Sequence, residues 1–152
     1  MLYMTKQQLQ NELKESMLAR NELKTSVLRM LISAINYHEI QKGGAGYKAT
    51  EEDVLSVVEK QIKQRKDSIE QFEKAERQEL AEKEKKELEM LLKYMPEQMS
   101  EDEVKKLVDE AIAQTGAKSI QEMGEVMGVL MSKTKGKADG SLVSKIVREE
   151  LG

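Results

Sequence analysis

The sequence predicts an all-α protein: an N-terminal bundle of about four helices followed by a small three-helix domain. The composition is dominated by helix-forming residues such as Glu, Lys, Leu, Met and Gln. Apolar residues recur at spacings of three and four, which is the period of a helix with one buried face. The single proline, Pro96, interrupts this pattern and marks the boundary between the two parts.

The composition excludes several classes of site. The 152 residues contain no cysteine, so disulfides, thiolate metal sites and a cysteine nucleophile are ruled out. The net charge of -3 is too small to predict a nucleic-acid or membrane partner. The longest uncharged run of the helical core, residues 30–38, is far shorter than the roughly 20 residues that cross a bilayer. We therefore expect a cytoplasmic protein with no membrane role.

Four helices are expected before Pro96. The first begins at the capping box formed by Thr5 and Gln8, and its narrow apolar stripe places it on the outside of the bundle. The second has a broad apolar face and is expected to be central. The third begins at Thr50 and carries acidic residues in its first turn, where the helix dipole favours them. These helices are expected over about residues 5–20, 21–41, 51–75 and 78–94.

The run KGGAGYKAT, residues 42–50, separates the second and third helices. It resembles a phosphate-binding loop only superficially. A Walker loop needs a glycine, four residues and then Gly-Lys-Ser/Thr after a strand, and this spacing is not present. We interpret the run as a flexible connection.

Polar residues of the N-terminal domain raise three questions. Arg29, Ser33 and Asn36 share the face of the second helix opposite its apolar stripe. This face is either simply solvated or a polar contact surface. His38 falls on the apolar stripe and fits a hydrogen-bonded core residue better than a ligand or base. Arg65 interrupts an apolar seam, and burying its charge unpaired would cost several kcal/mol. It is therefore either a structural ion pair or a ligand-facing arginine.

The domain boundary is predicted at residue 97, giving domains of residues 1–97 and 98–152. Ser100 with Glu103 forms a capping box for the next helix just after Pro96. Three short helices follow.

The second of these three helices begins at Ser119 and the third follows Asp139. Gly124 and Gly128 lie four residues apart, so one side of the second helix would let another helix approach closely. Each costs about 1 kcal/mol against alanine, so we expect them to serve packing within the three-helix domain.

The search for catalytic groups returns no arrangement that supports a reaction. One histidine and no cysteine allow neither a Cys-His pair nor a persuasive Ser-His-Asp set. No cluster of His, Asp and Glu has the spacing of metal ligands. We expect no catalytic centre, no metal site and no cofactor.

Binding is the better-supported class of function. Basic residues crowd around Gly136 and Gly140, and only Asp139 opposes them before Glu149. Lysines on a flexible loop suit backbone phosphates, and the amides at the start of the last helix add to such a site. The alternative is a loop whose lysines are simply solvated. The candidate RNA-binding residues are Lys133, Lys135, Lys137, Lys145 and Arg148.

Four segments together resemble the YqeY family across essentially the whole chain. They are LRMLISAI (residues 28–35), KQRKDSI (63–69), LLKYMPEQMS (91–100) and MGEVMGVLMSKTKGKADGSLVSKIV (123–147). The C-terminal part is also similar to the tail domain of the B subunit of the tRNA-dependent amidotransferase and to modules appended to some glutaminyl-tRNA synthetases.

This resemblance implies tRNA as a partner, with amidotransferase or aminoacyl-tRNA synthetase components as candidate protein partners. The family often carries the label of a carbon-nitrogen ligase with glutamine as amido donor. The chain has no counterpart of the kinase core of the amidotransferase B subunit or of the catalytic domain of its amidase subunit. We therefore expect an accessory tRNA-binding protein with no reaction of its own. The alternative is a protein-interaction adaptor without a nucleic-acid role, using Arg29, Ser33, Asn36 and Arg65.

Overall fold

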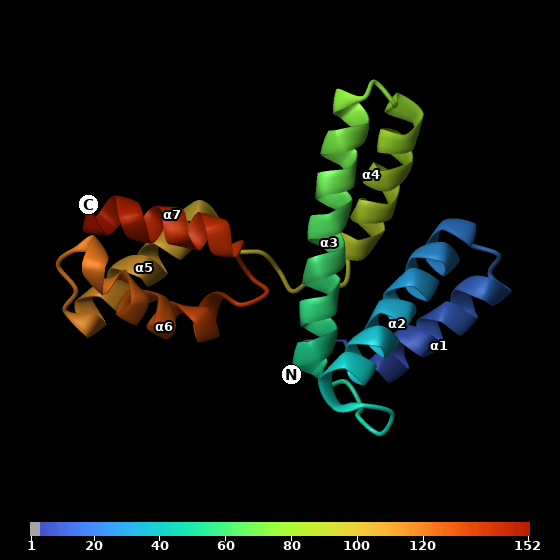
Figure 1. Cartoon of the computed structure of the whole chain (residues 1–152), viewed down its shortest axis with the longest axis horizontal. Helices are drawn as coiled ribbons and strands as arrows, with labels where there is room; N and C mark the ends of the chain where they lie inside the picture. The colour runs from blue at the N-terminus through green and yellow to red at the C-terminus, as the bar shows by residue number, and fades with distance from the viewer. Residues whose placement is uncertain (1–3) are drawn as a thin grey trace. The chain divides into compact units, whose positions relative to one another are not determined.

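The computed structural model describes residues 4–152, and over that range it consists of seven α-helices and one short 3-10 helix, with no strand. The all-α prediction is confirmed. The chain divides into two compact units, one ending at Pro96 and the other spanning Glu97–Gly152 (Figure 1). Each unit has its own buried apolar core.

The N-terminal unit is built from two helical hairpins. Helices α1 (Lys6–Leu18) and α2 (Glu22–Gly43) form the first hairpin, and α3 (Glu51–Lys74) and α4 (Gln78–Leu92) form the second (Figure 1). Its buried aliphatic core includes Leu9, Val27, Leu28, Leu31, Ile35, Val54, Val58, Ile62 and Leu91.

Capping fixes where these helices begin. Thr5 and Gln8 form the reciprocal capping box predicted for α1, and Thr50 forms a second with Asp53 at the start of α3. Helix α4 ends at Leu92, two residues earlier than expected. The Tyr94 N–H donates to the Leu91 carbonyl at 3.0 Å, so the chain leaves the helix in a tight turn before Pro96.

The C-terminal unit contains α5 (Glu101–Thr115), α6 (Met123–Thr134) and α7 (Gly140–Leu151), with the 3-10 turn Ile120–Glu122 leading into α6. Gly116 closes α5 with a φ of 71°, a left-handed conformation that glycine adopts without strain. Its core includes Val104, Val108, Ala111, Val126, Leu130, Val143, Ile146 and Val147.

The structure corrects the interpretation of the α6 glycines. Gly124 and Gly128 are exposed, and a Cβ added to either would meet nothing within 4 Å. No neighbouring helix of the described chain packs against them. The buried face of α6 is instead formed by Val126, Leu130 and Thr134, because these residues point into the core of the unit.

None of the helices within residues 4–152 is both long and apolar enough to pass through a membrane.

Candidate functional site

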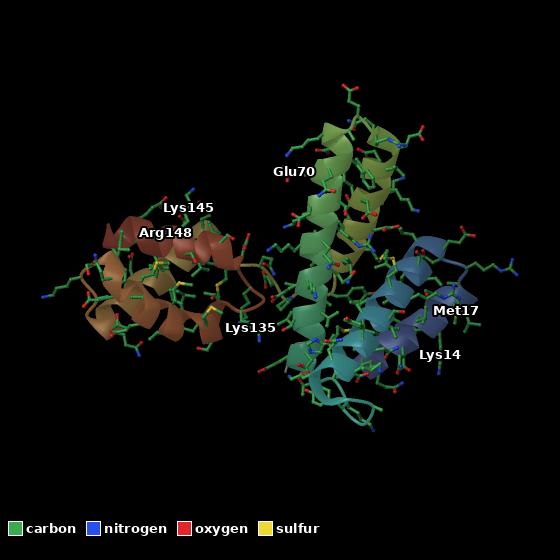
Figure 2. All side chains as sticks on the ribbon, in the orientation of Figure 1. Lys14, Met17, Glu70, Lys135, Lys145 and Arg148 are labelled. Carbon is green, nitrogen blue, oxygen red and sulfur yellow. The ribbon has the colours of Figure 1, made fainter. Side chains whose placement is uncertain are left out.

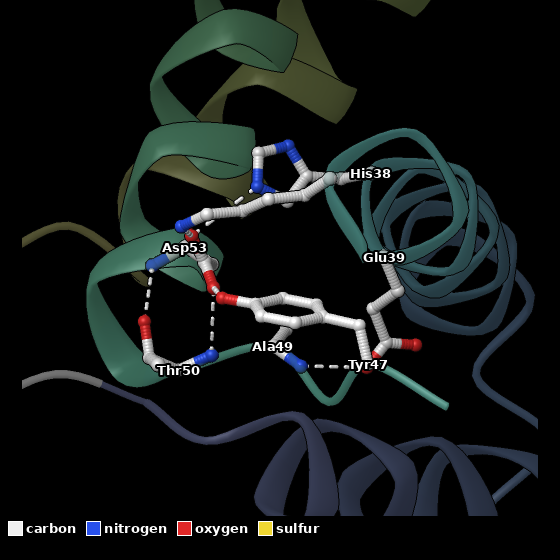
Figure 3. Close-up of polar contacts among 7 residues, drawn as sticks. His38, Glu39, Tyr47, Ala49, Thr50 and Asp53 are labelled. Carbon is white, nitrogen blue, oxygen red and sulfur yellow. Dashed lines mark hydrogen bonds and ion pairs between the residues drawn. The ribbon is translucent and has the colours of Figure 1, made fainter. Parts of the chain in front are cut away.

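A buried carboxylate lies at the junction of the two hairpins, where the connection from α2 enters α3 (Figure 3). Asp53 is 5% exposed, and its Oδ1 accepts from the Lys42 ammonium at 2.7 Å while His38 Nε2 lies 3.3 Å away. Its Oδ2 accepts from the Tyr47 hydroxyl at 2.6 Å and from the Thr50 N–H at 2.9 Å. His38 is therefore hydrogen-bonded, as its position predicted, but its side chain is 33% exposed and does not belong to the core.

Burial alone would raise the pKa of Asp53, because it removes water from the charged form. The hydrogen bonds from Lys42, Tyr47 and the Thr50 backbone outweigh this effect and hold the pKa well below its ordinary value. The carboxylate is thus charged at neutral pH and surrounded by donors. An acceptor saturated in this way is suited to holding the junction together rather than to taking a proton from a substrate.

A second buried carboxylate fixes the same connection. Glu39 accepts from the Lys6 ammonium of α1 at 2.6 Å and from the Ala49 N–H at 2.7 Å. The Lys6 hydrogen bond, with the Ala49 amide, lowers the pKa of Glu39 below its usual value. The connection expected to be flexible is therefore held at Tyr47, by Asp53, and at Ala49, by Glu39. Glycine composition alone did not predict these bonds.

Arg65 is a structural ion pair, one of the two alternatives left open by the sequence. It is 5% exposed, its Nη1 donates to Glu87, and the same nitrogen lies 3.1 Å from the Glu84 carboxylate. Both carboxylates come from α4, which explains how an arginine occupies an apolar position of α3. Its Nη2 lies 3.5 Å from the Met30 Sδ of α2.

Only three of the four residues of the predicted polar contact surface lie on one face. Arg29, Ser33 and Asn36 are all exposed on the outward side of α2. The buried Arg65 does not belong to this surface.

A small cavity of about 410 Å³ lies where α1, the start of α2 and the end of α4 meet. Three of its polar lining groups pair with one another: Lys24 lies 3.2 Å from the Glu12 carboxylate, and the Tyr94 hydroxyl donates to the same carboxylate at 3.3 Å. Burial, with the nearby Glu12 charge, raises the pKa of Tyr94.

The five predicted RNA-binding residues lie on the C-terminal unit as two groups. Lys145 and Arg148 are exposed on α7, three residues apart, and share that face with Ser141 and Ser144. Figure 2 shows Lys145 and Arg148 on α7 and Lys135 beside the end of α6. The second group is formed by Lys133, Lys135 and Lys137.

None of these five cations has a carboxylate within ion-pair distance in residues 4–152. Glu150 lies 3.7 Å from Lys105 of α5. Asp139 accepts from the Ser141 N–H at 3.0 Å. Lys133, Lys135, Lys145 and Arg148 are exposed, and Lys137 is half-buried.

The loop between α6 and α7 is fixed by the segment that precedes α5. The Gly136 carbonyl accepts from the Gln98 side-chain amide at 2.8 Å, and the Lys137 carbonyl accepts from the Met99 N–H at 2.7 Å. Gly136 has a φ of 76°, a conformation that favours glycine. The loop was expected to be flexible, but these bonds present Lys135 and Lys137 from a tied backbone.

The start of α7 differs from the expected anion site. The Asp139 carboxylate caps the helix and places a negative charge beside its first amides. A phosphate would have to displace this carboxylate, so the cationic side chains, and not the helix terminus, are the groups available to an anion.

Among the residues that the structure describes, no group of three or more His, Cys, Asp or Glu side chains could hold a metal ion. The fold and surface define a class: all-helical proteins of two compact units, with two groups of basic residues on the C-terminal three-helix unit.

The chain belongs to the Yqey-like protein family, whose model matches residues 6–151. The resemblance read from its motifs is thereby confirmed.

Curated relatives include fungal proteins. The chain is 36% identical over 126 residues to "Altered inheritance of mitochondria protein 41, mitochondrial" of Saccharomyces cerevisiae strain S288c, covering 79% of this chain and 66% of that protein. The protein of the same name from Pyrenophora tritici-repentis is 35% identical over 150 residues, or 95% of this chain and 79% of the relative. An uncharacterized protein of Schizosaccharomyces pombe is 39% identical over 92 residues, covering 60% of this chain and 72% of the relative. The chain thus spans about two thirds of the Saccharomyces cerevisiae protein.

Proposed function

We propose that the chain is a non-catalytic tRNA-binding accessory protein of the glutamine-dependent amidotransferase or aminoacyl-tRNA machinery. The observation that carries the proposal is the set of five cations on the C-terminal unit without carboxylate partners among residues 4–152. Free ammonium and guanidinium groups contact backbone phosphates, which supply affinity and position but little sequence information.

Two features support phosphate binding over a merely solvated face. The loop backbone is tied by Gln98 and Met99, so Lys135 and Lys137 lose less freedom on binding than they would from a mobile loop. On α7, Ser141 and Ser144 place hydroxyl donors beside Lys145 and Arg148. Hydroxyls and cations on one face are common phosphate contacts.

The resemblance of the C-terminal unit to the amidotransferase tail domain makes tRNA the favoured RNA. The fungal relatives' names mention mitochondria and name no RNA, so they leave this choice open. The cytoplasmic location expected from the sequence stays a prediction.

Binding of total tRNA at increasing salt tests the proposal. If all five cations neutralise phosphates, the logarithm of the binding constant falls with the logarithm of salt concentration with a slope of about -3.5 to -4.5. Changing Lys133, Lys135 and Lys137 together to Gln should weaken binding and reduce the magnitude of that slope by about 2.

The matched control changes three exposed lysines of the N-terminal unit, Lys14, Lys63 and Lys83, to Gln. It alters net charge by the same amount and should leave affinity and slope close to those of the parent. Absence of salt-sensitive tRNA binding by the parent chain, or equal losses in both triple variants, would overturn the proposal.

A further inference from the structure

The outward face of α2 carries a regular row of uncharged side chains that the proposed function does not use. Its members follow spacings of three and four along the helix. All of them are exposed, with Met30, Ile40 and Tyr37 at 50%, 62% and 64%. We call this row the α2 outer seam, and it consists of Leu23, Ser26, Met30, Ser33, Tyr37 and Ile40.

The absence of charge distinguishes this seam from the exposed faces of α3 and α4. Charged residues form 35% of the chain, yet none of the six seam residues is charged. The hairpin of α3 and α4 instead carries exposed ion pairs, such as Lys74 with Glu70 at 2.8 Å and Lys85 with Glu82 at 3.2 Å. An uncharged, partly apolar face in so charged a chain is typical of a surface that another protein covers.

The spacing indicates what shape of partner the seam fits. Alternating steps of three and four form the heptad pattern by which one helix packs along another. The opposite side of α2 is already buried in the bundle through Val27, Leu31 and Ile35, so the seam is a second packing face of the same helix. A helix is therefore the occupant that fits it.

We propose that the α2 outer seam packs antiparallel against the α2 outer seam of a second copy of this chain. In an antiparallel pair, a residue followed by a step of three lies opposite a residue followed by a step of four. We place the two-fold axis between residues 31 and 32 of each copy, which sets the register. Ser26 then lies opposite Tyr37 of the second copy and Met30 opposite its Ser33. Leu23 lies opposite the second copy's Ile40 at each end.

Side-chain volume favours this orientation. Each serine faces a large residue, Met or Tyr, so the layers fill evenly. A parallel pair would place Ser26 and Ser33 against themselves and Tyr37 against Tyr37, alternating voids with crowded layers. Both arrangements bury the same residues, and only the antiparallel one matches their sizes.

The polar residues beside the seam agree with self-pairing. In the antiparallel register Arg29 faces Asn36 of the second copy, whose amide oxygen accepts from a guanidinium. No pair of like charges meets in this register. Within one chain, the Arg29 Nη2 donates to the Met17 Sδ at 3.4 Å, a weak acceptor that an amide oxygen would replace.

Sedimentation of the full chain tests the association. We expect a dimer at about 100 μM, above the micromolar dissociation constants of weak interfaces. Ser33→Glu should raise the dissociation constant at least about tenfold, because it buries a carboxylate opposite Met30. Ser132→Glu makes the same change at an exposed position of α6 and should have no effect; circular dichroism confirms that both variants fold.

Disulfide trapping tests the orientation, since the chain contains no cysteine. Ser26→Cys and Tyr37→Cys variants, one carrying a mass tag, are mixed in a glutathione redox buffer. The antiparallel register predicts cross-links between the two variants, and links of each variant to itself would overturn it. A monomer at every concentration, or a seam that binds only a different protein, would overturn the proposal altogether.

Discussion

At the scale of single residues, the glycines of this chain serve different purposes that spacing alone does not separate. At Gly43 an added Cβ would lie 2.8 Å from the Tyr47 Cβ, so the small residue is needed for the loop to close on α2. At Gly124 and Gly128 the same atom would meet nothing within 4 Å. The α6 glycines therefore cost helix stability without a packing reason among residues 4–152.

Gly128→Ala is expected to raise the free energy of unfolding by up to about 1 kcal/mol, because alanine is the better helix former and the site has room. Gly43→Ala is the matched control. It should lower stability, since Tyr47 must move although its hydroxyl is bonded to Asp53. Urea denaturation measures both changes. A loss of stability in Gly128→Ala would show a close contact at that position.

Asp53 makes stability depend on pH. Its pKa is depressed in the folded chain, so its contribution is present above the unfolded pKa of about 3.9 and is lost as pH falls through the lower folded value. Asp53→Asn should cost about 2–4 kcal/mol at pH 7 by removing charged hydrogen bonds.

The difference in free energy of unfolding between Asp53→Asn and the parent should become smaller below about pH 4, because protonation of Asp53 then begins to favour the unfolded parent chain. Urea denaturation from pH 7 to pH 3 measures this gap. Asp67→Asn, at an exposed position of α3, should change stability little at any pH. A gap that is constant or grows with acidification would contradict the assignment.

At the scale of helices, partners on neighbouring elements decide what an isolated pattern leaves open. The three-and-four spacing of α3 predicted a packing seam, and Leu55, Val58 and Ile62 are buried. Arg65 occupies the next position of that seam because Glu87 and Glu84 of α4 compensate its charge. The spacing predicted which face of α3 is buried, and the two carboxylates of α4 explain why an arginine lies on that face.

Arg65→Ala should lower the free energy of unfolding by about 3–5 kcal/mol, because it leaves the buried Glu87 without its cation. The double variant Arg65→Met with Glu87→Leu removes both charges and fills their volume. It should recover most or all of the parent stability. Thermal unfolding of the two variants gives the comparison, and a double variant as unstable as Arg65→Ala would contradict a simple ion pair.

The two glycine-containing connections are held by hydrogen bonds from residues outside them. Glycine and lysine composition predicted flexibility both before α3 and between α6 and α7. In the structure, Glu39 and Asp53 bind the first connection, and Gln98 binds the second. These partners lie outside the loops, so the loop sequences could not reveal them.

At the scale of the whole molecule, each compact unit has a separate apolar core. Residues 97–152 should therefore fold when expressed alone, as many domains of about 55–65 residues do. The expected result is a helical circular dichroism spectrum and one cooperative thermal transition. Val108→Asp in the same fragment is the control, because it buries a charge in the core and should unfold it. A fragment without helical signal would show that the two units depend on each other.

The sequence was sufficient for the helices, because capping residues and apolar periodicity act within a few residues of one another. Thr5 with Gln8 and Ser100 with Glu103 each form the capping box that their spacing predicts, and α3 begins after Thr50 as expected. The five candidate RNA-binding cations were also named from composition, and their binding role stays a prediction.

Sequence alone determined the all-helical class, the family motifs and most helix starts, since these depend on local propensities and spacing; the helix expected from Ser119 begins as a 3-10 turn, and α6 starts at Met123. Only the tertiary structure decided that Arg65 is a buried ion pair, that Gly124 and Gly128 face solvent, and that the α2 outer seam is exposed. These facts depend on which helix lies beside which. An apolar stripe states that a face favours burial, but the packing of the other helices determines whether that face is covered.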